Sequence, residues 1–435
     1  MIPLFVLAAL AGLMQAARSF APGALTASGG TELAFGFLLL TAFFTARVFA
    51  RAGLPKLTGY IGAGILVGPS VLGLIDQPMI GQLRLVGGVA TAVIALGAGA
   101  ELNLAAIRPQ LRVIRRTTLW SVLGTATALT ATLMALRPLV PFLDALSLVH
   151  ATVVGMTIAI ALTAKSPAVV MAMIGETRAE GPLTRTVLGM VVVADLGVIV
   201  LYGIGSAVAT AVVNGDVDIG TAVGGIAWEI FGSLAVGVFV GLVLGQFILH
   251  VGNGIGLFAL MLCAVVAEIG NAVHLDPLII ALAAGVWLEN VSRADARKLS
   301  EGFERSSLPV YLVFFALAGC KLHLHELVTL AVPVAVIVVM RAASFFVGAR
   351  IATSGPDTDP VVRRLAWLGL LPQAGLALAL AELVRRTFPT FGDAAFALVV
   401  GVVAINEMIA PVILRIAFLR SGEAGKRAGP ASGGH

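Results

Sequence analysis

Three charged side chains lie inside long apolar stretches of the sequence: Lys165, Asp195 and Arg341. Asp195 stands in MVVVADLGVIVLYGIG, residues 190–205, among apolar residues and glycines. An ionised carboxylate at the centre of a bilayer-spanning helix costs about 2.5–3.5 kcal/mol, so such a residue faces a bundle interior, a partner charge or a water-filled path. Its oxygens can bind a proton or a small monovalent cation. The length and hydropathy of the segments that carry these residues decide whether they lie in a membrane.

The composition places those segments in a membrane. The chain has 435 residues, of which 59% are hydrophobic and 12% charged, and its mean hydropathy is +1.03. Ordinary soluble domains carry about 25% charged residues, and the apolar runs here are too long and frequent for a soluble core. We read the net charge of +5 as loop charge that sets orientation, and the two cysteines suggest no disulfide framework. We therefore predict an all-α polytopic membrane protein.

Apolar runs and loop charges predict thirteen transmembrane helices after residue 31. The spans are 32–50, 57–74, 82–102, 117–137, 148–174, 184–213, 221–250, 254–273, 277–291, 306–322, 326–350, 362–386 and 393–419. With the first span starting outside, 20 Lys and Arg residues lie in inside loops and 6 in outside loops. This asymmetry predicts a cytoplasmic C-terminus. Residues 1–31 fit either a cleaved signal peptide or an extra helix, and the basic tail 420–435 is expected to be disordered.

Two spans contain helix breakers. ALTAKSPAVV puts Pro167 inside the fifth span, and GLLPQAGLAL puts Pro372, Gln373 and Gly375 inside the twelfth. Proline removes a backbone donor and clashes with the preceding turn. A broken helix persists in a membrane only where protein or a polar cavity satisfies the freed backbone groups.

The two breaks occupy matching places in the chain. If residues 32–213 and 254–419 are taken as six-helix repeats and 221–250 as a linker helix, each break falls in the fifth span of its repeat. A single linker helix makes the second repeat start on the opposite side of the membrane. The sequence therefore predicts one transmembrane domain over 32–419, built from inverted repeats, with a substrate site near the bilayer midplane.

Residues at the first break can complete a site around Asp195. Hydroxyls and freed carbonyls, from Thr163 and Ser166 among others, can supply further oxygen ligands for a cation. Lys165 is interpreted as an internal counter-ion that competes with the cation for Asp195. The alternative is a structural salt bridge of Asp195 with Lys165 or Arg341.

Arg341 follows AVPVAVIVVM and has no carboxylate within one turn. It is interpreted as a fixed charge that holds a helix bundle or competes for the site carboxylate, or as a structural partner of Glu382 or Glu407. No cofactor and no resident metal site are predicted, because CKLHLHEL lacks the HExxH spacing and no Gly-rich phosphate loop follows a strand. An enzyme is therefore not expected.

Five stretches resemble the monovalent cation–proton antiporters, also called the sodium/hydrogen exchanger family. They are LPKLTGYIGAGILVGPSVLGL (54–74), IALTAKSPAVVMAMIGETRAEGPLT (160–184), VVVADLG (191–197), HLDPLIIALAAGVWLEN (274–290) and LGLLPQAGLALAL (368–380). The likeness covers about residues 32–419. Within the family, the chain resembles the bacterial Kef- and Nap-type exchangers. It implies two broken helices crossing at an ion site, a mobile core bundle, a dimerisation domain, a homodimer and elevator-like alternating access.

The resemblance also implies roles for single residues. Asp195 matches the ion-binding aspartate, Thr163 and Ser166 match the polar motif of a broken helix, and Arg341 matches the basic residue of the core bundle. Two positions depart from the pattern. Ala194 stands where the family usually has Asp, Asn or Gln, and Lys165 stands where a small polar residue, commonly Thr, is usual.

We therefore expect a multi-pass protein of the cell inner (plasma) membrane that exchanges Na⁺ or K⁺ for H⁺. Two alternatives use the same fold. A permanent positive charge at Lys165 suits an anion, such as an organic acid moved with protons. A locked Lys165–Asp195 salt bridge suits a non-transporting sensor or partner subunit.

Overall fold

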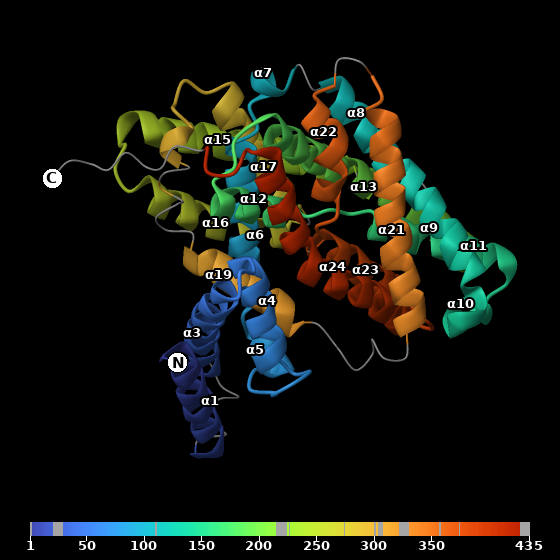
Figure 1. Ribbon diagram of the computed structural model, residues 1–435, viewed down its shortest axis with the longest axis horizontal. Helices are drawn as coiled ribbons and strands as arrows, with labels where there is room; N and C mark the ends of the chain where they lie inside the picture. The colour runs from blue at the N-terminus through green and yellow to red at the C-terminus, as the bar shows by residue number, and fades with distance from the viewer. Residues whose placement is uncertain are drawn as a thin grey trace. The chain divides into compact units, whose positions relative to one another are not determined.

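The computed structural model describes most of the chain, and its described residues form helices, turns and connections with no strand. These residues are 2–20, 29–108, 111–214, 224–225, 227–273, 275–299, 302, 308–321, 330–355, 358–373 and 375–426. A helix lies within every predicted span, which confirms the all-α polytopic fold (Figure 1). In this part of the chain, 7 helices are long and apolar enough to cross a membrane, and shorter apolar helices accompany them.

The two ends predicted to lie outside the transmembrane domain both contain ordered residues. In the first 31 residues, α1 (Ile2–Phe20) is a helix that contacts α3 (Gly29–Arg51). The tail 420–435 was expected to be disordered, but its first part is held by hydrogen bonds between Glu423 and the start of another helix. Residues 427–435 of that tail lie outside the described part of the chain.

The chain divides into two compact units, and each unit combines two distant stretches of sequence. Unit 1 takes its residues from Met1–Asn103 and Glu229–Leu322, and unit 2 from Leu104–Trp228 and His323–Ala428. Each predicted repeat therefore contributes helices to both units. All candidate site residues lie in unit 2.

Unit 1 is held together by close helix packing at small residues. Its other helices are α4 (Lys56–Val67), α5 (Gln77–Gln82), α6 (Arg84–Ala100), α15 (Ser233–His250), α16 (Ile255–Ala272), α17 (Pro277–Asn290) and α19 (Leu308–Cys320). A Cβ at Gly285 of α17 would lie 2.6 Å from the Ala100 nitrogen, and one at Gly99 of α6 would lie 2.9 Å from the Val286 nitrogen. The two helix backbones therefore touch, as small residues permit between membrane helices.

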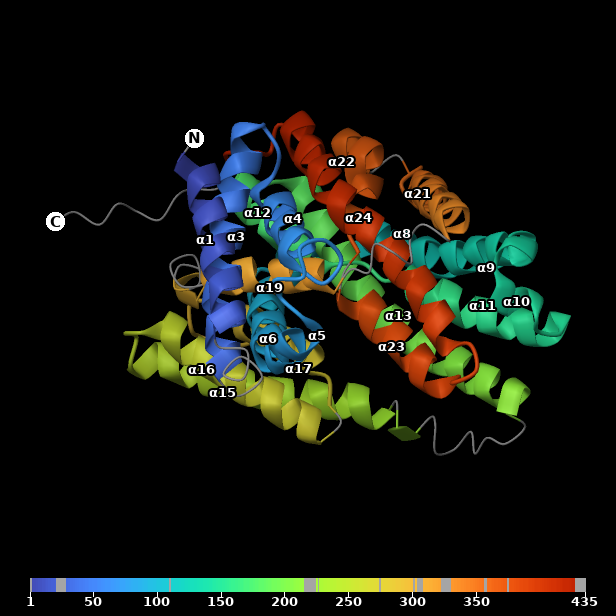
Figure 2. The ribbon, with the colours of Figure 1, turned by 90° about the horizontal axis from the view of Figure 1, so that it is seen from below.

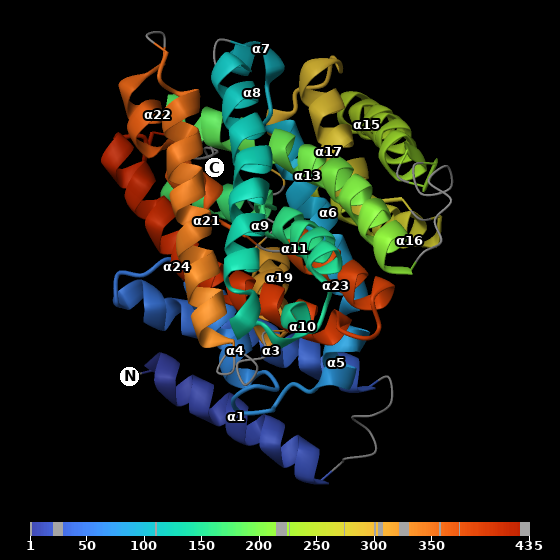
Figure 3. The same cartoon turned by 90° about the vertical axis from the view of Figure 1, so that its right-hand side faces the viewer.

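Unit 2 carries the two interrupted helices. Its first stretch contains α7 (Leu104–Ile107), α8 (Leu111–Leu119), η2 (Trp120–Gly124), α9 (Thr125–Ala135), η3 (Arg137–Leu139), α10 (Pro141–Asp144), α11 (Leu148–Leu162), α12 (Pro167–Thr177) and α13 (Pro182–Asn214). Its second stretch contains α21 (Ala331–Ala352), α22 (Pro360–Leu365), η5 (Ala366–Leu370), α23 (Gly375–Thr387) and α24 (Gly392–Ser421). Figure 2 shows α23 alongside α24, and Figure 3 shows α21 alongside α9.

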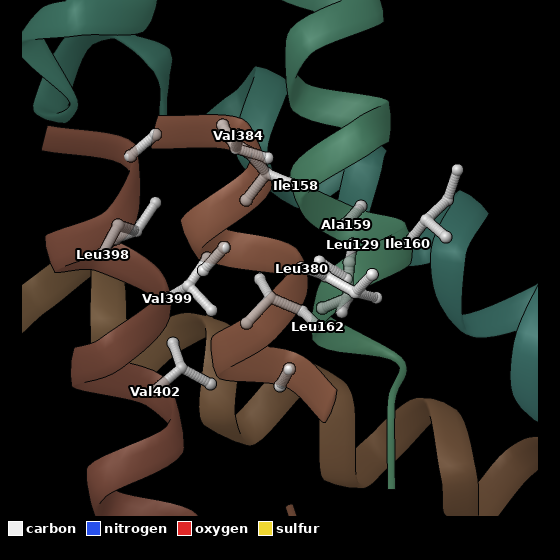
Figure 4. Packing of buried hydrophobic residues seen from close by; sticks show 14 of the residues in the cluster. Leu129, Ile158, Ala159, Ile160, Leu162, Leu380, Val384, Leu398, Val399 and Val402 are labelled. Carbon is white, nitrogen blue, oxygen red and sulfur yellow. The ribbon is translucent and has the colours of Figure 1, made fainter. Parts of the chain in front are cut away.

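An apolar cluster joins the two stretches of unit 2 beside the breaks. Figure 4 shows Leu162 and Ile158 of α11 facing Leu380 of α23 and Val399 of α24. All four side chains are buried. Between membrane helices such contacts stabilise through van der Waals packing, because lipid tails are as apolar as these side chains. The apolar contacts thus fix the helix ends on which the polar residues of the next section stand.

Candidate functional site

The two helix breaks meet. Residues 163–166 separate α11 from α12, and residues 371–373 follow η5 before α23. The Ser166 amide donates to the Pro372 carbonyl at 3.0 Å, which joins the breaks directly. The first break has a local cause. Pro167 opens α12 at its first turn, where a missing N–H costs no helical bond, and the Ser166 hydroxyl accepts from the Val169 amide at 3.2 Å.

Arg341 of α21 satisfies carbonyls that the breaks release. Its Nε donates to the Leu162 carbonyl at 2.8 Å, and its two terminal nitrogens donate to the carbonyls of Leu371 and Ala164 at 2.9 Å each. The side chain is fully buried. The three acceptors lie on both broken helices, so one guanidinium holds both breaks. Its fork of donors makes Arg suited to this geometry.

A second polar connection links the breaks to α24. The Gln373 side-chain nitrogen donates to the Leu162 carbonyl at 3.1 Å, and Asn406 donates to the Gln373 side-chain oxygen at 2.9 Å. Leu162 therefore accepts from Gln373 and Arg341 together. Gly375 is the first residue of α23. The second break is thus tied to the first and to α24.

Asp195 lies beside the first break. It is 3% exposed and stands within α13, far from either end of that helix. Its Oδ1 accepts a hydrogen bond from the backbone amide of Lys165 at 3.2 Å. The role of Lys165 as a counter-ion to Asp195 stays a prediction. In the structure the hydrogen bond comes from the peptide group of Lys165, while its ammonium donates to the Thr163 carbonyl at 2.9 Å.

The predicted hydroxyl groups also have local partners. The Thr163 hydroxyl donates to the Ile160 carbonyl at 2.7 Å, and the Ser166 hydroxyl caps α12 as described. Each hydroxyl oxygen has two acceptor lone pairs, so these bonds leave acceptor capacity on both. Thr163, Lys165 and Ser166 are all buried within the break, and the Lys165 amide contacts Asp195.

Two cations share one aromatic ring in this region. The Lys165 ammonium lies 5.0 Å from the centroid of Phe345, and the Arg341 guanidinium carbon lies 4.6 Å from it. Lys165 and Arg341 are 1% and 0% exposed. An aromatic ring stabilises a nearby cation through its quadrupole, by about 2 kcal/mol or more when the pair is desolvated. Phe345 therefore helps to accommodate two positive charges inside unit 2.

One proposed partner of Arg341 is wrong. Glu382 bonds instead to Arg385 and Arg386 on its own helix, at 2.7 and 2.9 Å. A partner three or four residues along a helix is within easy reach, whereas the Arg341 nitrogens point to carbonyls. Glu407, the other proposed partner, is fully buried in α24 next to Asn406.

Sequence reasoning missed Asn406 and Phe345. Asn406 and Glu407 form a polar pair in the middle of the last apolar span, and this pair is a signal that the sequence contains. Phe345 carries no such signal, because phenylalanine is common in membrane helices. Ala194, where the family usually has a polar residue, is fully buried and packs in the apolar cluster of unit 2.

The chain is similar to one described protein family and to solved structures. The family described as "Sodium/hydrogen exchanger, transmembrane" matches residues 38–420. A structure of the sodium proton antiporter MjNhaP1 from Methanocaldococcus jannaschii at pH 8 superposes with a TM-score of 0.64 at 13% identity, covering 89% of this chain and 97% of the other. An electron-microscopy structure of that antiporter gives 0.66 at 16% identity, covering 91% and 98%. No curated protein sequence matches the chain.

Proposed function

The chain belongs to the sodium/hydrogen exchanger family, and on this premise we propose that it exchanges a monovalent cation, Na⁺ or K⁺, for H⁺ by alternating access. The observation that carries the proposal is the buried Asp195 carboxylate beside two joined helix breaks. A buried carboxylate can hold one proton or one small cation, and broken helices supply backbone oxygen near it. In this proposal the protein performs transport and no covalent chemistry.

Lys165 acts as an internal counter-ion in the proposed cycle. When Asp195 is ionised and empty, the Lys165 ammonium offsets its charge, and an arriving cation displaces that ammonium. At about 4 Å and an effective dielectric of 20, such a charge pair is worth about 4 kcal/mol, enough to compete with a bound ion. The hydrogen bond from the Lys165 amide to Asp195 does not involve the lysine side chain, so the ammonium can move without breaking it.

The charge carried per cycle depends on Lys165. If only Asp195 exchanges its proton for a cation, each turnover moves one charge in each direction and is electroneutral. If Lys165 also loses its proton on cation binding, two protons move per cation and the exchange is electrogenic. Arg341 has a structural role in both cases, because arginine does not release a proton in proteins and its donors hold the two breaks.

The membrane arrangement follows from the loop charges. With 20 basic residues in loops on one side and 6 on the other, the proposed orientation places the C-terminus in the cytoplasm. We extend the proposal to a homodimer in the inner (plasma) membrane, as the family resemblance implies.

The test is cation-driven dissipation of an imposed pH gradient in proteoliposomes. We expect Na⁺ or K⁺ to dissipate the gradient for the wild-type protein, and Asp195→Asn to abolish the effect. Asp393→Asn, which neutralises an exposed carboxylate at the start of α24, is the matched control and should transport normally. Cation exchange by the Asp195→Asn variant would show that Asp195 is not the ion-binding residue.

The two alternative functions are outcomes of the same assay. A gradient insensitive to Na⁺, K⁺ and Li⁺ but dissipated by an organic anion would indicate the anion carrier. No response to any solute would indicate the non-transporting subunit. We favour cation exchange, because the family to which the chain belongs is described as a sodium/hydrogen exchanger family.

A further inference from the structure

Helix α13, which carries Asp195, receives the cap of its first turn from the far end of the chain. Its amides at Leu183 and Thr184 donate to the two carboxylate oxygens of Glu423 at 2.7 and 2.8 Å, and the Thr184 hydroxyl donates to the same carboxylate at 2.7 Å. Glu423 follows α24 and is 4% exposed. The first amides of a helix have no partner within the helix, and an anion at that end is favoured by the helix dipole.

The residue before α13 leaves space for the Glu423 side chain. The position before Pro182 is Gly181, which has no side chain to cap the helix, whereas Ser, Thr, Asp or Asn usually do so. A Cβ at Gly181 would lie 2.6 Å from Glu423 Oε1. The missing side chain therefore makes room for the glutamate.

Backbone bonds fasten the same segment to the preceding helix. Gly422 has a φ of +71°, which ends α24 and turns the chain. The Gly425 amide donates to the Thr177 carbonyl, the last residue of α12, at 2.9 Å, and the Glu180 amide donates to the Glu423 carbonyl at 3.0 Å. Residues 422–426, the C-terminal latch, thus hold the end of α12, the start of α13 and the connection between them.

The latch and the proposed ion site lie at opposite ends of one hairpin. Helix α12 runs from the break at Ser166 to the latch at Thr177, and α13 runs from the latch past Asp195. The Lys165 amide joins the two helices again at Asp195. The stretch from Pro182 to Asp195 is continuous helix that rises about 1.5 Å per residue. A displacement of its first turn is therefore passed along the helix to Asp195.

We propose that the C-terminal latch positions Asp195 for cation binding and that Glu423 is the positioning residue through which it acts. The proposal rests on the function proposed above. A cap that only stabilised α13 would affect the amount of folded protein, and hence the maximal rate, but not the apparent KM for the cation. A latch that sets the distance between Asp195 and the break changes the apparent KM.

The experiment compares Glu423→Ala, Glu423→Gln and Gly181→Ala in the full-length chain. Hydrogen exchange at Leu183 and Thr184 reports the latch itself, and Na⁺- or K⁺-driven exchange in proteoliposomes reports the site. We expect Glu423→Ala and Gly181→Ala to speed amide exchange at least tenfold and to raise the apparent KM severalfold. Glu423→Gln keeps the shape of the side chain and should have an intermediate effect.

Glu180→Gln is the matched control, because it removes an exposed negative charge from the same connection and leaves the backbone bonds in place. It should leave both readouts unchanged. Faster amide exchange with an unchanged apparent KM would overturn the positioning role, and unchanged amide exchange in Glu423→Ala would overturn the latch. Failure of the wild-type protein to exchange cations would remove the proposed function and, with it, the positioning role, while the amide readout would still report the latch.

Discussion

At the residue scale, Lys165 contributes two groups with different partners. Its peptide amide donates to Asp195, and its ammonium donates to the Thr163 carbonyl 2.9 Å away beside the Phe345 ring. The first contact is independent of the side chain, while the second places a positive charge near the carboxylate. Replacing this lysine by a neutral residue therefore removes a positive charge near Asp195 and leaves the bond from the peptide amide in place.

We expect Lys165→Thr to raise cation affinity. Removal of a competing positive charge worth up to about 4 kcal/mol should lower the apparent KM for Na⁺ or K⁺ by at least tenfold, measured as dequenching of a pH dye in proteoliposomes. Lys165→Arg keeps the charge and serves as the control, with an apparent KM close to that of the wild type. Equal apparent KM values for Lys165→Thr and Lys165→Arg would contradict the counter-ion role.

At the element scale, the two broken helices are joined to each other and to α24. The Leu162 carbonyl at the end of α11 accepts from both Arg341 and Gln373, and Gln373 accepts from Asn406. These bonds replace the helical bonds lost at the breaks, as a membrane interior requires. The interrupted segments are thus fixed by side chains from α21 and α24.

A double-mutant cycle tests this connection. Gln373→Ala and Asn406→Ala should each lower the free energy of unfolding by about 1–3 kcal/mol, because each leaves a buried polar partner unsatisfied. The double variant should lose less than the sum, with a coupling of about 0.5–3 kcal/mol. Thermal unfolding in detergent measures the stability of the wild type, the two single variants and the double variant. Strictly additive losses would show that the two side chains do not act together.

The sequence predicts the helices and their breaks, but it does not predict the hydrogen-bond partners within the candidate site. Pro167 and Pro372 indicate breaks because proline removes a helical hydrogen bond and clashes with the preceding turn. Mid-span charges indicate the interior because the bilayer disfavours them. The partner of Arg341 could not be deduced in this way. Its acceptors are backbone carbonyls of Leu162, Ala164 and Leu371, and every residue has a carbonyl. Similarly, Glu423 caps a helix start 240 residues earlier, and its neighbourhood in sequence gives no hint of that distance.

At the scale of the whole molecule, each compact unit is assembled from one part of each predicted repeat. The helices of unit 1 approach closely where glycines face each other, as at Gly99 and Gly285. Another pair in the same unit is α15 and α17, where a Cβ at Gly237 would lie 2.6 Å from the Ala283 side chain. Contacts of this kind leave no room for a larger residue.

We expect Gly285→Ala to destabilise the protein by about 1–3 kcal/mol or more, because an added methyl group in a fully packed interface forces backbone shifts. Gly36→Ala is the control. Gly36 lies within α3, where an added Cβ meets nothing within 4 Å. The same change there should be neutral or slightly stabilising, since alanine favours the helix by about 0.5–1 kcal/mol. Equal melting temperatures for the two variants in detergent would contradict the packing described.

The interleaving of the two units also sets the order in which the nascent protein can mature. Domains fold broadly from the N-terminus as the ribosome releases them. The last described helix of unit 1, α19, ends at Cys320, so the described helices of that unit are all synthesised while about a quarter of the chain is still untranslated. Unit 2 is incomplete until α24 and Glu423 have been synthesised. Until then α13 lacks the cap from Glu423, so unit 2, which carries the proposed ion site, is the last unit to be completed during biosynthesis.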